Sequence, residues 1–369
     1  MKKVLLIDAL LLTAITLYTV IAYNISFTKP VVHNQVTRSE YVNVPISTTA
    51  TSTDRVYKGK IYNIFFHSLI VYPELAAKSK RSLYKDYMIT RDEFAIILEQ
   101  LYEHNFVLID VDSIYNIDAQ GKMTRKDLLL PEGKKALIIS LDDLSYYRTQ
   151  KGFGFANKLV IDTQGNVSTE VVAPDGRIEI TRNGDVVPML DDFVKEHPDF
   201  SIGGAKGIIA LTGFDGILGY RTQYSTSSTR DTEIIEAKEV VAKLKETGWK
   251  FASHSYTHDP SFTSNKITIN GLKSDIAMWD KEVRPLVGDT NIFVGPNGQI
   301  FKPNDERRKV LLDNGFKVLF GVGMDLYIHY FDEYVVMDRA DIDGFRIKHS
   351  PELLKPFFDT SLVGSKTTL

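Results

Sequence analysis

The sequence predicts an α/β fold, a closed or nearly closed (β/α) barrel of about seven parallel strands. Short apolar runs alternate with amphipathic helical patterns from Lys60 onward, and such alternation favours a parallel sheet. About seven strands over about 300 residues fit a barrel better than an open sheet. The strand candidates are residues 61–66, 106–109, 136–141, 207–211, 250–253, 291–294 and 317–320.

Helices are expected between these strands. Residues 90–105 form an amphipathic pattern in which Thr90 and Glu93 have the spacing of a capping box. Residues 231–248 and 304–315 are further helical stretches, and the second ends in Asn-Gly, a common stop signal.

One segment, residues 157–188, breaks the alternation. It carries Gln-Gly-Asn, Pro-Asp-Gly and Asn-Gly between alternating residues, and these are hairpin turn sequences. We expect an antiparallel β insertion on the loop after the third strand, projecting over the barrel mouth.

The composition limits the classes of function. The 369 residues include 43% hydrophobic and 25% charged residues, as in a globular protein with a sizeable core. The net charge of -3 comes from 44 basic and 47 acidic residues without a long run of either sign, which argues against a nucleic-acid partner. Cysteine is absent, so any metal must be held by His, Asp or Glu.

The N-terminus indicates export. Residues 1–23 place Lys2 and Lys3 before an apolar stretch long enough to cross a bilayer, interrupted only by Asp8. We expect a transmembrane anchor with the rest of the chain extracytoplasmic; a cleaved signal segment and a secreted protein is the alternative. Residues 24–58 are expected to be a flexible linker, and residues 59–369 the catalytic domain.

Two polar clusters follow strand candidates. Asp142 and Asp143 come directly after residues 136–141, and His254 and His258 follow residues 250–253. Because the C-terminal ends of barrel strands converge on one mouth, these groups can form a metal site with one carboxylate left over as a base. Taken singly, an Asp pair is more often a helix cap or turn, and His-x-x-x-His is as often a surface pair. Their joint placement favours the site.

These residues resemble the motifs of the polysaccharide deacetylases, carbohydrate esterase family four. "SLDDL" (140–144) is similar to the first motif, "HSYTH" (254–258) to the second and "FVGPNGQIF" (293–301) to the third, and the resemblance covers roughly residues 60–358. It implies a deacetylase-type barrel that hydrolyses N- or O-acetyl groups on a glycan. It also implies Asp142 as general base and a divalent metal ion, zinc by default, held by Asp143, His254 and His258.

The sequence departs from this family at three places. Leu144 replaces the usual Gly, and Val294 stands where an Arg often orients the base; Arg339 is the expected substitute. The family's general acid has no clear counterpart, and His349 is the candidate. Expected substrate-binding residues are His67, Tyr146, Tyr147, Tyr220, Arg221, Pro296 and Asn297.

The function expected from these observations is metal-dependent deacetylation of a cell-envelope or extracellular polysaccharide. Val294 and the missing acid motivate one alternative, a non-catalytic, metal-containing glycan-binding envelope protein. A metal-dependent amidohydrolase of small molecules is a further alternative. The insertion argues against it, because it suggests an extended groove instead of a closed pocket.

Overall fold

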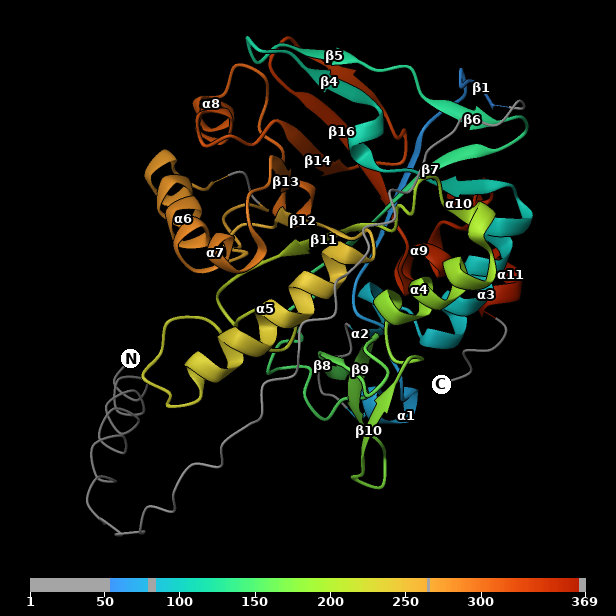
Figure 1. Cartoon of the computed structure of the whole chain (residues 1–369), viewed down its shortest axis with the longest axis vertical. Coiled ribbons are helices and arrows are strands. Elements are labelled where there is room, and N and C mark those ends of the chain that lie inside the picture. The colour runs from blue at the N-terminus through green and yellow to red at the C-terminus, as the bar shows by residue number, and fades with distance from the viewer. Residues whose placement is uncertain (1–53, 79–83, 264–265, 365–369) are drawn as a thin grey trace, which may run out of the picture. The chain divides into compact units, whose positions relative to one another are not determined.

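The computed structural model describes residues 54–78, 84–263 and 266–364, and its centre is a closed barrel of 7 parallel strands (Figure 1). The spatial order is β11, β12, β13, β14, β16, β2 and β7, and pairing of β7 with β11 closes the ring. The strands are β2 (Tyr62–Phe66), β7 (Lys135–Asp142), β11 (Ile208–Leu211), β12 (Lys250–Ser253), β13 (Ile292–Val294), β14 (Val318–Val322) and β16 (Val335–Asp341). The predicted barrel is confirmed.

The strand membership of the barrel differs from the prediction in two places. The predicted strand at residues 106–109 is β3 (Phe106–Leu108), which pairs with the first residues of β7. The last residues of β7 pair on the same edge with β11. β3 therefore lies beside the ring and is not one of its seven strands. β16 takes the seventh place and was not predicted, because its last residues are mostly polar. A short strand, β15 (Ile328–Tyr330), pairs with β16 antiparallel.

The inside of the barrel follows the strand period of two. Its apolar floor includes Ala136, Ile138, Ala210, Ala252, Val335 and Met337. Continuing the same alternation along each strand places Asp142, Thr212, His254 and Arg339 at inward positions near the C-terminal ends. The polar site therefore lies directly above an apolar core.

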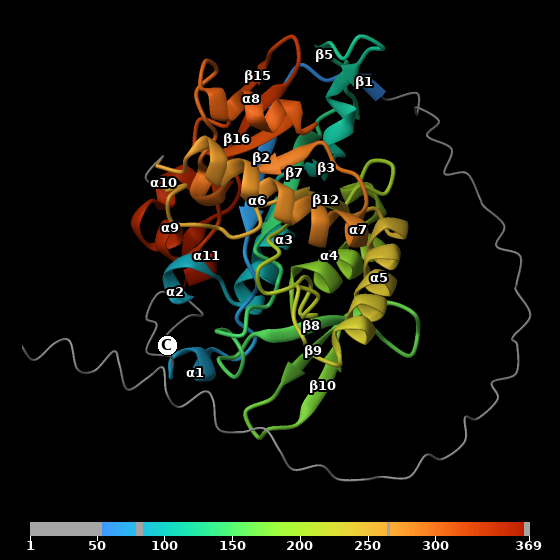
Figure 2. The same ribbon diagram turned by 90° about the vertical axis from the view of Figure 1, so that its left-hand side faces the viewer.

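Helices cover the outer face of the barrel in two groups (Figures 1 and 2). One packs with the outward residues of β2, β7 and β11 and contains α3 (Arg91–Glu103), α4 (Val186–Glu196), α5 (Arg230–Glu246) and α11 (Thr360–Gly364). The other packs on β13, β14 and β16 and contains α6 (Ile269–Glu282) and α8 (Glu306–Asp313). Shorter helices are α1 (Pro73–Ala76), α2 (Tyr84–Tyr87), α7 (Arg284–Val287), α9 (Gly344–His349) and α10 (Pro351–Leu354).

The local sequence signals act as expected. The Thr90 side chain accepts from the Glu93 backbone, and the Glu93 carboxylate accepts from the Thr90 backbone, so the capping box opens α3. α8 ends at Asp313 before Asn314 and Gly315, whose φ of 86° only glycine adopts readily.

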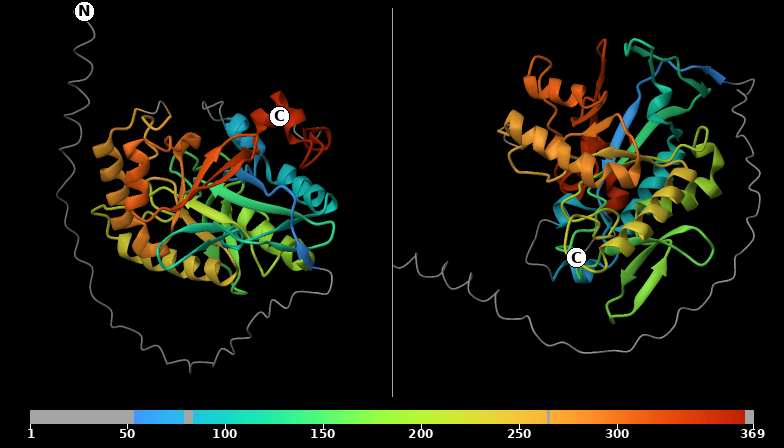
Figure 3. Two further views of the ribbon diagram at one scale, coloured as in Figure 1. Left: turned by 90° about the horizontal axis from the view of Figure 1, so that it is seen from above. Right: turned by 60° about the vertical axis from the view of Figure 1, so that its left-hand side comes forward.

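The predicted insertion is a three-stranded antiparallel sheet of β8 (Ala156–Ile161), β9 (Val167–Val172) and β10 (Ile178–Thr181). It packs on the loop after β11, where the Leu159 N–H donates to the Leu218 carbonyl at 3.0 Å. In Figure 3 the yellow helix α5 lies between these green strands and the orange helices. The last residues of the predicted segment, from Val186, already belong to α4.

Two further antiparallel strand pairs lie before β7 in the chain. β4 (Tyr115–Ile117) pairs with β5 (Met123–Arg125), and β1 (Asp54–Val56) pairs with β6 (Leu129–Pro131). Residues 54–56, at the end of the predicted linker 24–58, thus form a strand of a two-stranded sheet. Backbone pairing at a sheet edge requires few apolar side chains, so composition did not reveal it.

The predicted membrane segment, residues 1–23, and the linker up to residue 53 lie outside the described residues. Within residues 54–364, as far as the structure describes them, no helix has the length and apolarity that a membrane crossing requires.

Candidate active site

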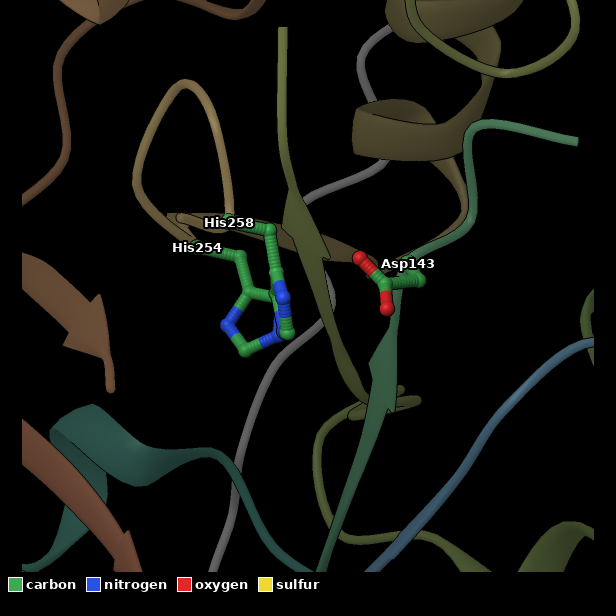
Figure 4. Close-up of side chains that lie close together, drawn as sticks. All are labelled: Asp143, His254 and His258. Carbon is green, nitrogen blue, oxygen red and sulfur yellow. The ribbon is translucent and has the colours of Figure 1, made fainter. Parts of the chain in front are cut away.

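Asp143, His254 and His258 converge at the barrel mouth (Figure 4). One ligand atom from each lies within 4.8 Å of the others. Asp143 follows β7, and both histidines follow β12. Two imidazole nitrogens and a carboxylate oxygen are the donors of many catalytic zinc sites, which leave further positions open. The residues present therefore fit the implied metal.

His254 is held in the tautomer that a metal needs. Its Nδ1 donates to the Val294 carbonyl at 2.9 Å, which leaves Nε2 with a free lone pair. Burial lowers the pKa of His254, although the carboxylates of Asp142 and Asp143 act in the opposite direction. The imidazole is therefore biased toward the neutral form that coordinates a cation.

The loop between the two histidines is fixed by one carboxylate on α6. Asp275 accepts from the Tyr256 N–H at 2.6 Å, from the Thr257 N–H at 2.9 Å and from the Thr257 hydroxyl at 2.5 Å. Ser255 and His258 have φ of 60° and 49°, which are unfavourable for residues with a Cβ. These contacts offset that local strain.

Asp143 adopts a left-handed backbone conformation with φ of 60°. The Tyr147 hydroxyl donates to its Oδ1 at 2.5 Å. Burial alone would raise the pKa of Asp143, but nearby His254, His258 and His67, together with the Tyr147 hydrogen bond, lower it. Asp143 is therefore ionised and suited to a metal.

Asp142 lies beside the cluster and is bound by Arg339. The guanidinium donates to Oδ1 at 2.6 Å and to Oδ2 at 2.9 Å, and both side chains are buried. Burial would raise the pKa of Asp142, yet the Arg339 charge, with His254, lowers it to about 2. Oδ2 lies 3.9 Å from His254 Nε2, so this fixed carboxylate borders the metal ligands.

Arg339 is in turn fixed on several sides. It donates to the Ser140 hydroxyl at 2.9 Å and to the Gly321 carbonyl at 3.3 Å, and its charge lies 4.2 Å from the centre of the Phe65 ring. The structure thus brings Arg339 from β16 to the base, where the family pattern would place an Arg at Val294. Val294 instead supplies the carbonyl that orients His254.

His67 continues the inward alternation of β2 beyond Phe65. It lies close enough to Asp142, Asp143 and Asp343 to lower the pKa of each carboxyl, so it lies at the mouth; its role in substrate binding stays a prediction. Pro296 and Asn297 begin the turn after β13; Pro296 is buried, whereas Asn297 is exposed with φ of 52°. Of these two predicted substrate contacts, only Asn297 has a side chain that is exposed to a ligand.

Three further predicted substrate contacts, Tyr146, Tyr220 and Arg221, line the cleft described below and stay predictions, although their side chains mainly contact the protein itself. Tyr146 is 2% exposed with its ring in the core, and Tyr220 is 3% exposed with its hydroxyl bonded to the Leu159 carbonyl. The Arg221 guanidinium binds the Tyr146 carbonyl and the Asp215 carbonyl and so ties two loops together. In the pair Tyr146-Tyr147 the two rings point in different directions, and only Tyr147 reaches the cluster.

His349 is not brought to the cluster by the contacts that the structure records. It lies exposed at the end of α9, with its ring 4.5 Å from that of Phe345. Its role as general acid stays a prediction.

A cleft of about 690 Å³ is lined by Tyr147, whose hydroxyl donates to Asp143, although none of the three ligands borders it. Its walls come from the insertion, the loop after β11 and the start of α5, and charged groups of both signs line it, including Lys158, Glu170 and Glu236. Phe214, 43% exposed, stacks on Tyr147 near this opening. The sequence analysis did not identify Thr212, Phe214 or Asp275, because the residues that they contact are distant in sequence. For Thr212 alone a signal existed: the alternation of side chains along β11 places the residue after the strand on the inner face of the barrel.

No protein-family model and no curated protein matches this chain. Solved structures match it in fold at low identity. The deacetylase PplD of Streptococcus pyogenes, solved with acetate, is 13% identical with a TM-score of 0.42, covering 81% of this chain and 98% of that one. The de-N-acetylase of Aggregatibacter actinomycetemcomitans is 17% identical with a TM-score of 0.45, covering 81% and 99%. IcaB of Ammonifex degensii is 14% identical with a TM-score of 0.41, covering 78% and 93%.

Proposed function

We propose that this chain is a metal-dependent hydrolase that removes N- or O-linked acetyl groups from a cell-envelope or extracellular polysaccharide. The observation that carries the proposal is the geometry of the mouth. A three-ligand cluster of Asp143, His254 and His258 lies beside a separate carboxylate, Asp142, which Arg339 keeps ionised and oriented.

Each side chain at the mouth has a separate role in the proposed reaction. A divalent ion, zinc by default, would polarise the acetyl carbonyl and lower the pKa of water there. Asp142 accepts the proton of the attacking water, and Arg339 fixes the direction in which its carboxylate lies. His254 and His258 hold their ring nitrogens toward Asp143, and His67 faces the same space.

The non-catalytic alternative loses one of its two motives. It depended on Val294 in place of the arginine that orients the base, and on the missing general acid, which His349 does not supply in the contacts that the structure records. Because Arg339 binds both oxygens of Asp142, the base is oriented after all. Hydrolysis is therefore the better-supported function.

The cleft supports a polymeric substrate. It extends from Tyr147 between the insertion and α5, so sugars next to the acetylated unit can lie in it. Tyr147 lines the cleft and stacks on exposed Phe214, and sugars pack well on such aromatic faces. We further propose that residues 1–23 anchor the chain in the membrane, which would place the mouth outside the cytoplasm.

The test is acetate release by the full-length chain in detergent from a panel of acetylated glycans, before and after chelation and zinc return. We expect metal-dependent release from the wild-type chain. Asp142→Asn should reduce turnover at least about 100-fold, the lower end of general-base effects, while zinc stays bound at one equivalent. Glycan binding without release from any substrate would favour the non-catalytic protein.

A further inference from the structure

Two residues outside the ligand set connect the loops that carry the ligands. The Tyr147 hydroxyl lies 2.5 Å from Asp143 Oδ1 and 2.7 Å from Thr212 Oγ1. Thr212 Oγ1 lies in turn 3.2 Å from Ser145 Oγ. All three hydroxyl groups are on buried or half-buried side chains, so these contacts are shielded from water.

The direction of this chain of hydrogen bonds follows from proton counting. An ionised carboxylate only accepts, so Tyr147 donates its single proton to Asp143. The Tyr147 oxygen therefore accepts from Thr212, and the Thr212 oxygen accepts from Ser145. Each hydroxyl has one assigned role, and Asp143 is left with its second oxygen for a cation.

The segment that contains Thr212 also binds the histidine loop. The backbone N–H groups of Gly213 and Phe214 donate to the Tyr256 carbonyl at 3.0 and 3.1 Å, and the His254 N–H donates to the Leu211 carbonyl at 3.0 Å. A Cβ on Gly213 would lie 2.4 Å from the Tyr256 ring. Residues 211–214 thus contribute no ligand, yet they bond to both loops that do.

The Tyr147 ring is itself fixed. It stacks on Phe214 with 5.0 Å between ring centres and an interplanar angle of 22°. A fixed ring places its hydroxyl at one position, and a hydrogen bond from a fixed donor determines the orientation of the carboxylate. Such outer contacts commonly change metal affinity by about 10- to 100-fold when they are removed.

We propose that Tyr147 is a positioning residue that orients Asp143 for the metal ion, with Thr212 holding the Tyr147 hydroxyl in place. The sequence predicted substrate binding for Tyr147, and the positioning role is a separate one. The inference rests on the metal site of the proposed function, but it concerns metal affinity and not turnover.

The experiment measures zinc affinity of the metal-free, full-length chain by competition with a coloured chelator, using zinc alone. Tyr147→Phe should weaken zinc binding about 10- to 100-fold. Thr212→Val should weaken it less, and Thr212→Ser, which keeps the hydroxyl, should restore wild-type affinity. With Co²⁺ in place of zinc, Tyr147→Phe should also change the visible absorption, which reports ligand geometry.

The matched control is Tyr84→Phe. The Tyr84 hydroxyl donates to the Thr149 carbonyl at 2.6 Å, so this change loosens the loop that carries Tyr147 without touching a ligand. It should bind zinc as the wild-type chain does. If Tyr147→Phe binds zinc within twofold of wild type, or if Tyr84→Phe loses as much, the positioning role is refuted while the proposed function stands. Failure of the wild-type chain to bind zinc would refute both.

Discussion

At the scale of single residues, the site depends on a buried charge pair. Arg339 and Asp142 are both enclosed by the barrel, and each is the other's main partner. Removing one member of a buried pair leaves an uncompensated charge, which typically costs about 3–5 kcal/mol. Replacing both with neutral residues avoids that cost.

We therefore expect Arg339→Met to lower the free energy of unfolding of the metal-free chain by about 3–5 kcal/mol. The double variant Arg339→Met with Asp142→Asn should recover most of this loss, because no charge then remains unpaired. Urea unfolding of the wild-type chain, both single variants and the double variant gives the coupling free energy between Arg339 and Asp142. Strictly additive losses would show that the pair does not act as a unit.

The neighbouring residues show what sequence reasoning reaches at this scale. Motif spacing identified Asp142, Asp143, His254 and His258, and the structure brings all four together. The sequence could not predict which of Tyr146 and Tyr147 contacts the site. Both lie in an irregular loop, where no regular alternation of side chains indicates which one faces the barrel mouth and which one the core.

At the scale of elements, α6 acts on the site without providing a ligand. Asp275 accepts three hydrogen bonds from Tyr256 and Thr257, between the two histidines. In Asp275→Asn, one carboxylate oxygen becomes an NH₂ group that faces donors, so at least one contact is lost.

We expect Asp275→Asn to weaken zinc binding and to reduce acetate release together, each by about 10-fold or more, as for other outer contacts of metal sites. The matched control is Asp280→Asn on the same helix, whose carboxylate pairs with Arg284 away from the histidine loop. Zinc competition and acetate release measure both variants. Equal effects of the two changes would attribute the loss to α6 stability and not to the loop.

Helices and strands could be predicted from the sequence where a few neighbouring residues determine them. Turn sequences identified the β8–β10 insertion, and Thr90 with Glu93 identified the start of α3. β16 escaped because Asp338, Arg339 and Asp341 give it the composition of a loop. Those polar residues belong in a strand because the barrel mouth provides partners for them, which only the closed ring reveals.

At the scale of the whole molecule, one buried carboxyl links the start of α4 to the segment that follows β2. Asp185 precedes α4, and its Oδ1 accepts from the Val186 N–H at 2.7 Å and from the Leu69 N–H at 3.2 Å, shortly after β2. It is fully buried without a cationic partner among the recorded contacts of the described residues. Burial raises the pKa of Asp185 from 3.8 to about 7, against the lowering effect of its hydrogen bonds.

This pKa predicts how stability depends on pH. Because the folded chain holds the Asp185 proton more tightly than the unfolded chain, its contribution is complete below pH 3.8 and is lost as pH rises to about 7. The loss is about 4 kcal/mol, from about 1.4 kcal/mol per pKa unit. Asp185→Asn resembles the protonated form, so it should flatten the fall in stability between pH 5 and pH 8 and exceed wild type at pH 8.

Thermal unfolding of the metal-free chains at both pH values tests this. Asp175→Asn is the control, since that exposed carboxylate in the insertion has a lowered pKa and does not titrate in this range. An unchanged pH dependence in Asp185→Asn would place the titrating group elsewhere. A flattened pH dependence would identify Asp185 as the group through which pH acts on the contact between the start of α4 and the segment after β2, a few residues from His67 at the mouth.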